Sequence, residues 1–283
     1  MSSSSTSVIQ PTGLVHGHGE CCYLDETIPV LSHILALDLV DRRDGEATMK
    51  HPNTGWKLIL HEGGPDVKDK PERNHYGVRV SNNQEVDNAY QYLLAEKEKL
   101  GLKKVVKRKE RDGSYSMFFV EPGGNYWEIE SYEHRHQAGL PYDVSYPWNK
   151  PLSEEKFPGR GYVPQAFTHG TLQCDDVERS RRFYTEVLGL EIAAGFSTAQ
   201  YIKHPASPWY IVILQRKPRQ YLAPVNRFTL QLGSASEIEQ AHRDFSTNGA
   251  AAGITDLGKL DSANGKTSFI FSDPDKNWWE LTG

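Results

Sequence analysis

The chain repeats itself at a fixed interval, and this duplication constrains its fold more than any other feature of the sequence. Three segments return later in recognisable form: Lys50–Leu60 as Lys203–Leu214, Asn74–Val80 as Asn226–Leu232, and Phe118–Ser131 as Ile270–Gly283. All three pairs lie 152 or 153 residues apart. A constant offset across most of a chain indicates duplication. We therefore expect one domain near residues 12–137 and a second near residues 161–283.

Each half also divides into two similar modules. Strand-like segments open the modules at His18–Leu24, His75–Val80, His169–Cys174 and Arg227–Leu232. A helix-like segment follows each opening and is clearest in Asn83–Gly101 and Asp175–Glu191, where apolar residues recur every three to four positions. Shorter runs of alternating apolar and polar residues then indicate strands. The sequence predicts an α+β protein with four βαβββ modules.

Two segments fall outside the modules. Residues 138–160 are rich in proline and aromatic residues, so they are poorly suited to continue a sheet and too apolar for a free tether. We expect this linker to pack against one or both halves. Residues 1–11 begin with a serine run and are expected to form a disordered tail.

The composition excludes several classes of protein. A net charge of −5 gives no reason to expect nucleic-acid binding. No segment approaches the roughly 18 apolar residues that cross a bilayer, and the start of the chain does not resemble a secretory signal. Three cysteines are too few for a disulfide framework. These features predict a soluble, cytoplasmic protein. They leave open whether it forms a homodimer.

The modules resemble those of the vicinal oxygen chelate superfamily, which contains glyoxalase I, the type I extradiol dioxygenases and the bleomycin and fosfomycin resistance proteins. The resemblance rests on the four modules, on a helix ending FYTEVLGLE (Phe183–Glu191) and on closing strands of the form Asp/Glu-Pro-x-x-Asn-x-Trp-Glu. It covers nearly the whole chain outside the tail and linker. It implies that the two modules of each half pair to form a cupped mixed sheet around a cavity.

The resemblance also implies a metal site in the N-terminal half. The ligands of the family come from the first strand of each module and the last strand of a module, which here gives His18, His75 and Glu128. The C-terminal half offers His169 and Glu280 but has Arg227 at the place of the second histidine. Arginine stays charged and only donates hydrogen bonds, so it cannot ligate a metal. We expect Arg227 to pair with Glu280 in a degenerate site.

Strand alternation supports this grouping independently. Three sets each share one strand face: His18, Glu20 and Cys22; His75, Gly77 and Arg79; and Tyr126, Glu128 and Glu130. A single histidine at a strand start is more often structural, but two at equivalent points of a repeat favour a metal site. The candidate substrate contacts are Arg79, Glu20, Phe118 and Glu130. Arg79 could bind an anionic substrate group or neutralise one of these two glutamates.

The ligand set indicates the chemistry. Glyoxalase I has a further carboxylate ligand on the last strand of its first module, and our alignment places Ile59 there. Three ligands resemble the extradiol dioxygenases more closely, and two imidazoles with one carboxylate suit Fe(II), with Mn(II) or Zn(II) possible. The favoured function is a ring-cleaving dioxygenase that uses Fe(II) and O2 on a small aromatic diol.

Two residues affect this interpretation. His51 is the candidate catalytic base, although its repetition as His204 favours a structural role in the turn. Phe118 occupies the place of a tyrosine in the extradiol motif, which counts against a dioxygenase. Two alternatives remain open: a redox-neutral lyase or isomerase like glyoxalase, and a metal-free protein of the resistance type that binds a small molecule.

Overall fold

The computed structural model describes residues 8–107, 114–263 and 265–283. It divides into two compact units. Unit 1 contains the chain up to His18 together with Leu172–Gly283, and unit 2 contains Gly19–Thr171. Part of the predicted tail, residues 1–7, lies outside the described residues. The rest of it is held in unit 1, because the Ile9 amide donates to the Val187 carbonyl at 3.1 Å and the Ile9 side chain is buried.

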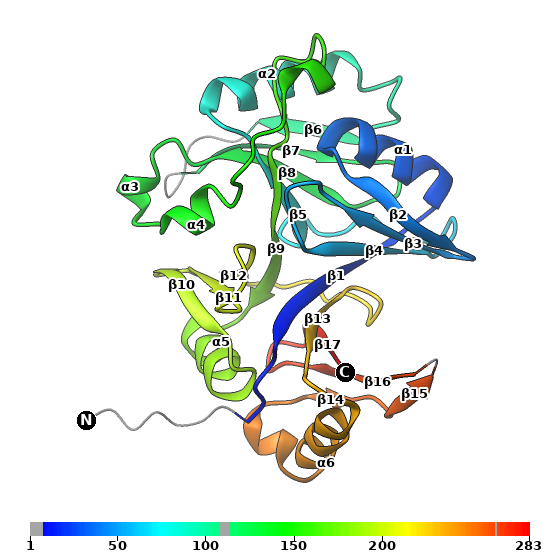
Figure 1. Cartoon of the computed structure of the whole chain (residues 1–283), viewed down its shortest axis with the longest axis vertical. Coiled ribbons are helices and arrows are strands. Elements are labelled where there is room, and N and C mark those ends of the chain that lie inside the picture. The colour runs from blue at the N-terminus through cyan, green and yellow to red at the C-terminus, as the bar shows by residue number, and fades with distance from the viewer. Residues whose placement is uncertain (1–7, 108–113, 264) are drawn as a thin grey trace. The chain divides into compact units, whose positions relative to one another are not determined.

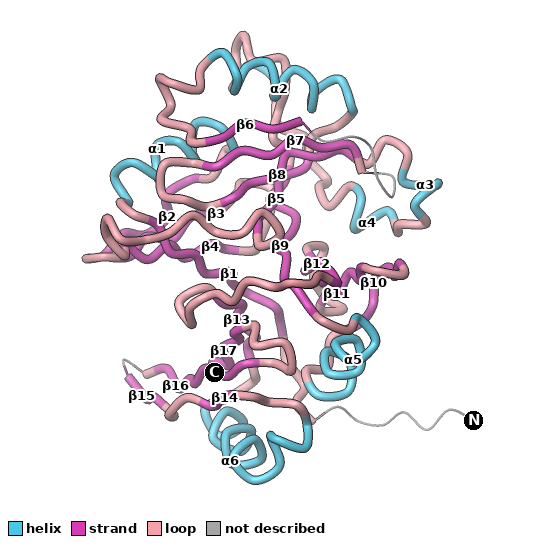
Figure 2. The backbone as a smooth tube through the Cα atoms, turned by 180° about the vertical axis from the view of Figure 1, so that it is seen from behind, coloured by secondary structure: helices cyan, strands magenta, loops and turns pink. Residues whose placement is uncertain are grey.

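The four predicted modules are present (Figures 1 and 2). The first two modules contain β1 (Gly13–Cys21), α1 (Leu24–Leu35), β2 (Asp38–Arg43), β3 (Glu46–Lys50) and β4 (Lys57–Glu62), then β5 (His75–Arg79), α2 (Asn83–Ala95), β6 (Lys104–Lys107), β7 (Tyr115–Val120) and β8 (Tyr126–Ser131). The third contains β9 (Ala166–Cys174), α5 (Val177–Arg182), the π-helical turn η2 (Phe183–Val187), β10 (Glu191–Phe196), β11 (Ala199–Lys203) and β12 (Tyr210–Gln215). The fourth contains β13 (Arg227–Gln231), α6 (Ala235–Ala252), β14 (Asp256–Leu257), β15 (Asp261–Ala263), β16 (Lys266–Ser272) and β17 (Trp278–Thr282). The linker carries α3 (Arg135–Ala138), α4 (Tyr142–Ser145) and η1 (Glu154–Lys156). The α+β prediction is confirmed.

The pairing of modules differs from the prediction. The described strands form a nine-stranded sheet in the order β14-β16-β17-β13-β1-β4-β3-β2, with β15 beside β16, and an eight-stranded sheet in the order β10-β11-β12-β9-β5-β8-β7-β6. Within unit 1, β1 pairs with β13, and within unit 2, β5 pairs with β9. The first module therefore pairs with the fourth and the second with the third, so the expected pairing of the two modules within each half is wrong. Because every module opens with the same kind of strand, either pairing satisfies the backbone hydrogen bonds, and the sequence repeat cannot distinguish the two.

Alternation along β5 and β8 separates a core face from a polar face. Tyr76, Val78 and Trp127 are buried on the core face, where Trp56 stacks on Phe167 with ring centroids 4.8 Å apart. Helix α2 covers β6, β7 and β8 (Figure 1), and the Asn82 side chain caps its first turn by accepting from the Glu85 amide. The other face of these strands is left for polar side chains.

The linker and the residues just after it pack within unit 2, as expected. Phe157 and Val163 are buried against Ala36, and the Tyr162 hydroxyl donates to the Ile34 carbonyl at 3.1 Å. This segment is therefore held in place by the burial of apolar side chains and not by pairing as a further strand of a sheet.

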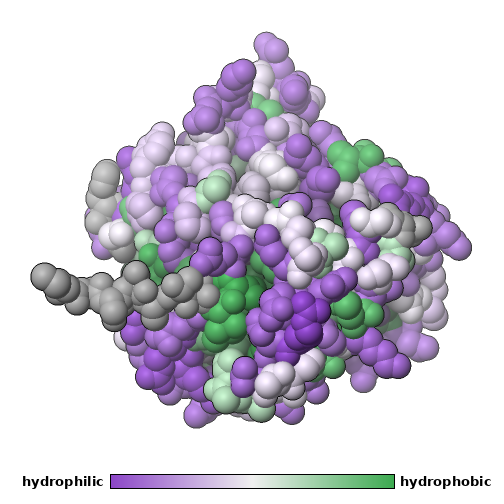
Figure 3. Space-filling view, turned by 60° about the horizontal axis from the view of Figure 1, so that its bottom comes forward, coloured by the Kyte–Doolittle hydropathy of each residue, from purple (hydrophilic) through white to green (hydrophobic). Residues whose placement is uncertain are grey.

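Most of the surface visible in Figure 3 is hydrophilic, with hydrophobic residues in small patches. Among the helices that the structure describes, none combines the length and the apolar character needed to cross a membrane.

Candidate metal centre

Three buried side chains from three strands converge in unit 2. His75 begins β5, Glu128 lies on β8 and His169 lies on β9. Nε2 of His75 lies 2.9 Å from Oε2 of Glu128, and Nε2 of His169 lies 3.2 Å from the same oxygen. One potential ligand atom from each residue falls within 4.8 Å of the other two. The structure therefore assembles two imidazoles and one carboxylate at one point.

Strand register explains the convergence. β5 pairs in parallel with β8 and antiparallel with β9, and Gly77 lies opposite both Glu128 and His169. The pairing of β9 skips Thr168, since Gly77 pairs with His169 and Val78 with Phe167. An extra residue in one strand is a β-bulge, which redirects the adjacent side chain. The bulge thus aims His169 at Glu128.

Gly77 provides the space that His169 occupies. A Cβ atom at Gly77 would overlap the imidazole ring of His169. The ring can therefore lie across β5 only because this position has no side chain. The sequence placed Gly77 on the ligand face but gave no signal of this role.

The Nδ1 atoms of both histidines are engaged away from the centre. Nδ1 of His75 donates to the Glu72 carbonyl at 2.7 Å, and Nδ1 of His169 lies 3.1 Å from Oε1 of Glu130. Such contacts orient metal-bound histidines and fix their tautomers. A carbonyl can only accept, so a neutral His75 carries its proton on Nδ1 and presents the lone pair of Nε2 to the Glu128 carboxylate. Two facing acceptors call for a cation between them, and the residues therefore fit a divalent metal.

The electrostatics agree with this donor set. Burial lowers the pKa of His75, which favours the neutral, ligating form. Burial alone would raise the pKa of Glu128, but its contacts with His169 and His75 lower it below its usual range. Burial also opposes charge on His169, yet the Glu130 and Glu128 carboxylates raise the pKa of His169 to about 9. A metal would therefore displace a proton from His169 on binding.

Replacing Gly77 by alanine is expected to weaken metal binding by about 10- to 100-fold, because the new methyl group displaces the His169 ring. Titration with Co(II) measures the affinity, and circular dichroism checks the fold. Gly195→Ala on β10 is the matched control, since its added Cβ would meet no atom within 4 Å. An unchanged affinity in the Gly77 variant would contradict the proposed position of His169.

The prediction of His18 as the third ligand is wrong. His18 lies in unit 1, where its Nε2 atom is 2.9 Å from Oγ1 of Thr229 and 3.3 Å from Oε2 of Glu280. His169, expected in a degenerate site, converges with His75 and Glu128 instead. The exchange of modules causes this difference, because the third ligand comes from whichever opening strand pairs with β5.

Unit 1 contains the degenerate counterpart of the centre. Nε of Arg227 donates to Oε2 of Glu280 at 3.1 Å, so the predicted pairing is confirmed. Burial opposes the charge of Glu280, but the His18 hydrogen bond and the Arg227 charge lower its pKa to about 2. An internal guanidinium thus compensates the carboxylate.

The register shows which residues correspond between the units. Thr229 lies opposite Glu280 and His16, as Gly77 lies opposite Glu128 and His169. His16 is therefore the counterpart of His169, at the 153-residue offset of the repeat, and was not among the predicted site residues. Two changes distinguish unit 1: Arg227 replaces His75, and Thr229 occupies the space that Gly77 leaves open.

His51 holds a turn instead of serving as a base. It is buried, its Nε2 donates to the Pro164 carbonyl at 2.9 Å, and its Nδ1 accepts from the Asn53 amide at 3.1 Å. Burial lowers the pKa of His51 to about 4. His204 makes the same pair of contacts, with the Pro11 carbonyl and the Ala206 amide. The structural role favoured by the repeat is confirmed, and the catalytic assignment is not supported.

The remaining predicted residues divide between the centre and its surroundings. Phe118 lies opposite Glu128 and packs edge-on against His75, with ring centroids 5.0 Å apart. Arg79 donates to Glu130 at 2.6 Å, so it neutralises that carboxylate. Glu20 is near the end of β1, where its carbonyl accepts from Lys70. Of the candidate substrate contacts, Phe118 touches His75 and Glu130 touches His169.

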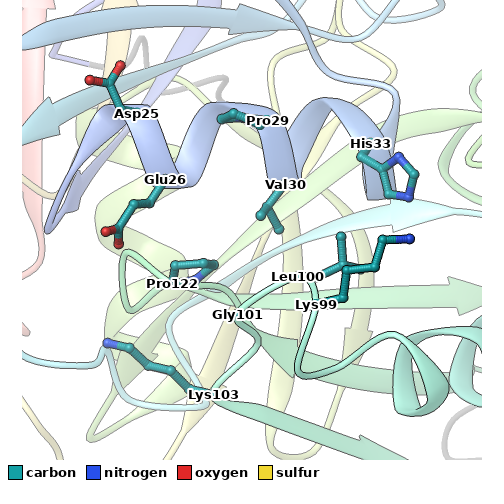
Figure 4. A pocket seen from close by; sticks show the side chains of 10 residues that line it. All are labelled: Asp25, Glu26, Pro29, Val30, His33, Lys99, Leu100, Gly101, Lys103 and Pro122. Atoms are coloured by element: carbon teal, nitrogen blue, oxygen red, sulfur yellow. The ribbon is translucent and has the colours of Figure 1, made fainter.

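A separate cavity of about 750 Å³ lies between α1 and the segment that follows α2 (Figure 4). Its lining includes the apolar side chains of Pro29, Val30, Leu100 and Pro122 together with the charged side chains of Asp25, Glu26, Lys99 and Lys103. None of the three converging residues lines it, so it is distinct from the candidate metal centre.

Comparison with known proteins identifies relatives of this fold. The sequence model of the Glyoxalase/Bleomycin resistance protein/Dioxygenase superfamily matches residues 166–281. Glyoxalase I from Zea mays superposes with a TM-score of 0.63 at 15% identity, over 95% of this chain and 92% of that one, and a mutant of that enzyme gives 0.65 at 14% identity. A putative dioxygenase from Bacillus subtilis gives 0.60 at 14% identity, over 96% of this chain and 85% of that one. No curated protein matches the sequence. At these identities the likeness to solved structures concerns the fold.

Proposed function

We propose that this chain, in which residues 166–281 match the model of the Glyoxalase/Bleomycin resistance protein/Dioxygenase superfamily, is a metal-dependent enzyme whose metal is held by His75, Glu128 and His169. The observation that carries the proposal is the approach of both Nε2 atoms to one oxygen of Glu128, at 2.9 and 3.2 Å. Two imidazoles and one carboxylate leave coordination positions open for a substrate, and this donor set is the facial triad of non-heme Fe(II) enzymes. We favour Fe(II), with Mn(II) and Zn(II) as alternatives.

The favoured reaction is ring cleavage of a small aromatic diol with O2. When bound, the metal supplies Lewis acidity toward a phenol and a place where substrate and O2 meet. The protein contributes charge and shape. Glu128 and Glu130 carry two negative charges and Arg79 one positive charge, so a divalent ion leaves the centre with one net positive charge. This balance favours an anionic substrate oxygen, and Phe118 offers an apolar ring beside His75.

A second candidate is a redox-neutral lyase or isomerase. Two observations favour it: both ring nitrogens of His51 are engaged by the backbone, and Phe118 lacks the hydroxyl expected in an extradiol enzyme. A metal-bound substrate that only exchanges a proton needs neither residue. Zn(II) or Mn(II) would serve this chemistry as well as iron.

One experiment separates these possibilities. The protein is purified without oxygen or chelator, its metals are determined, and portions are reconstituted with Fe(II), Mn(II) or Zn(II). Oxygen uptake with catechol and its alkyl derivatives, together with the absorbance of a ring-opened product, supports the dioxygenase. Anaerobic turnover of a thiohemiacetal with Zn(II) or Mn(II) supports the redox-neutral enzyme. Failure to bind any of the three metals would contradict both proposals and favour a metal-free binding protein.

A further inference from the structure

Glu130 connects the candidate metal ligand His169 to a buried arginine. Oε1 of Glu130 lies 3.1 Å from Nδ1 of His169 and accepts from Nη2 of Arg79 at 2.6 Å. All three side chains are buried. A buried carboxylate needs a positive partner, and Arg79 supplies it on the side away from the centre. Glu130 can therefore hold His169 in one orientation without being a ligand itself.

Arg79 in turn holds the linker. Its Nη1 atom donates to the Ser145 carbonyl at 2.5 Å and to the Val144 carbonyl at 3.1 Å, and its guanidinium lies 4.2 Å from the centroid of the Tyr132 ring. Val144 and Ser145 end α4, so their carbonyls have no partner within that helix. The contacts form a continuous chain from His169 through Glu130 and Arg79 to the last turn of α4.

The register places this pair one step along the same strands as the ligands. Arg79 lies opposite Glu130 in the parallel pairing of β5 and β8, two residues beyond the pair Gly77 and Glu128. Because side chains alternate, these positions share the ligand face.

Unit 1 shows that the fold does not require the pair. In its equivalent parallel pairing, Gln231 lies opposite Thr282, two residues beyond Thr229 and Glu280. Gln231 is exposed, whereas Arg79 is fully buried. The ion pair is therefore present in the unit that has the complete ligand set and replaced by neutral residues in the unit that lacks one.

We propose that Glu130 and Arg79 are positioning residues that orient His169 and couple metal binding to the docking of α4. The inference rests on the proposed function, because it takes His169 as a metal ligand. Metal bound at the centre would fix the His169 ring, and thereby Glu130, Arg79 and the two linker carbonyls. Docking of α4 would strengthen metal binding in return, because the coupling between two binding events is reciprocal.

The test compares native protein with Glu130→Gln, using Co(II) as the probe. We expect the variant to bind Co(II) about 10- to 100-fold more weakly and to show an altered visible spectrum of the bound ion. In hydrogen exchange, Co(II) should increase protection of residues 142–146 in the native protein and have a smaller effect in the variant. Thr282→Val changes the equivalent position of unit 1 and should leave all three readouts unchanged.

A second variant guards against misfolding caused by an unpaired buried arginine. Arg79→Gln combined with Glu130→Thr introduces the residue types that unit 1 carries at these positions, so neither position leaves a buried charge without its partner. It should also bind Co(II) more weakly and lose the metal-dependent protection of the linker. Native affinity, spectrum and protection in both variants would overturn the inference while the proposed metal site stands. Absence of Co(II) binding by the native protein would overturn the proposed function together with the inference.

Discussion

Replacing His75 by alanine is expected to abolish stoichiometric metal binding and leave the chain folded. The substitution removes one of three donors, so the affinity should fall by more than about 100-fold, beyond the loss typical of residues that only support a ligand. Glu128 keeps His169 as a partner at 3.2 Å, which limits the cost in the free energy of unfolding to about 1–3 kcal/mol. Metal analysis measures the first effect and thermal denaturation the second.

Two further alanine variants distinguish the site in the structure from the site inferred by resemblance. His169→Ala should lose the metal as His75→Ala does, because both imidazoles face Glu128. His18→Ala should retain it, because His18 contacts Glu280 and Thr229 in unit 1. Loss of metal from the His18 variant alone would show that the modules pair as the sequence repeat suggested, and would contradict the assignment of His169.

Arg227→His combined with Thr229→Gly is expected to create a second metal site in unit 1. The first change replaces a guanidinium that bonds Glu280 by an imidazole at the position equivalent to His75. The second removes the side chain opposite His16, as Gly77 leaves room opposite His169. His16, Glu280 and the introduced imidazole would then repeat the donor set of unit 2.

The gain is measured most clearly in a His75→Ala background, where the metal content should rise from almost none to about one ion per chain. Arg227→His alone is the control. Thr229 still fills the space needed by the His16 ring, so the second imidazole would have to come from His18, 3.3 Å from Glu280, and this variant should bind more weakly. If the double change adds no metal, other features of unit 1 exclude the ion. The equivalence of positions between the two units would then be insufficient to define a metal site.

Several parts of this protein were predictable from the sequence because they depend on short segments. The four βαβββ modules follow from apolar periodicity, which is a local property, and from the constant offset between segments, which is read directly from the sequence. His75 and Glu128 lie on β5 and β8, parallel neighbours within one module, so one module already brings them together. The pair Arg227 and Glu280 has the same relation in the fourth module, and for that reason its contact was also predicted correctly.

Only the tertiary structure decided the third ligand. It comes from β9, and β9 lies beside β5 because the second module pairs with the third, although every module offers a similar strand edge. The bulge at Thr168 then interrupts the alternation of side chains along β9. Alternation alone therefore does not predict which face of the sheet His169 points to. Sequence alone identified the residue types of the centre, because they repeat. The choice between His18, His16 and His169 required the register of paired strands, which depends on contacts between modules far apart in the chain.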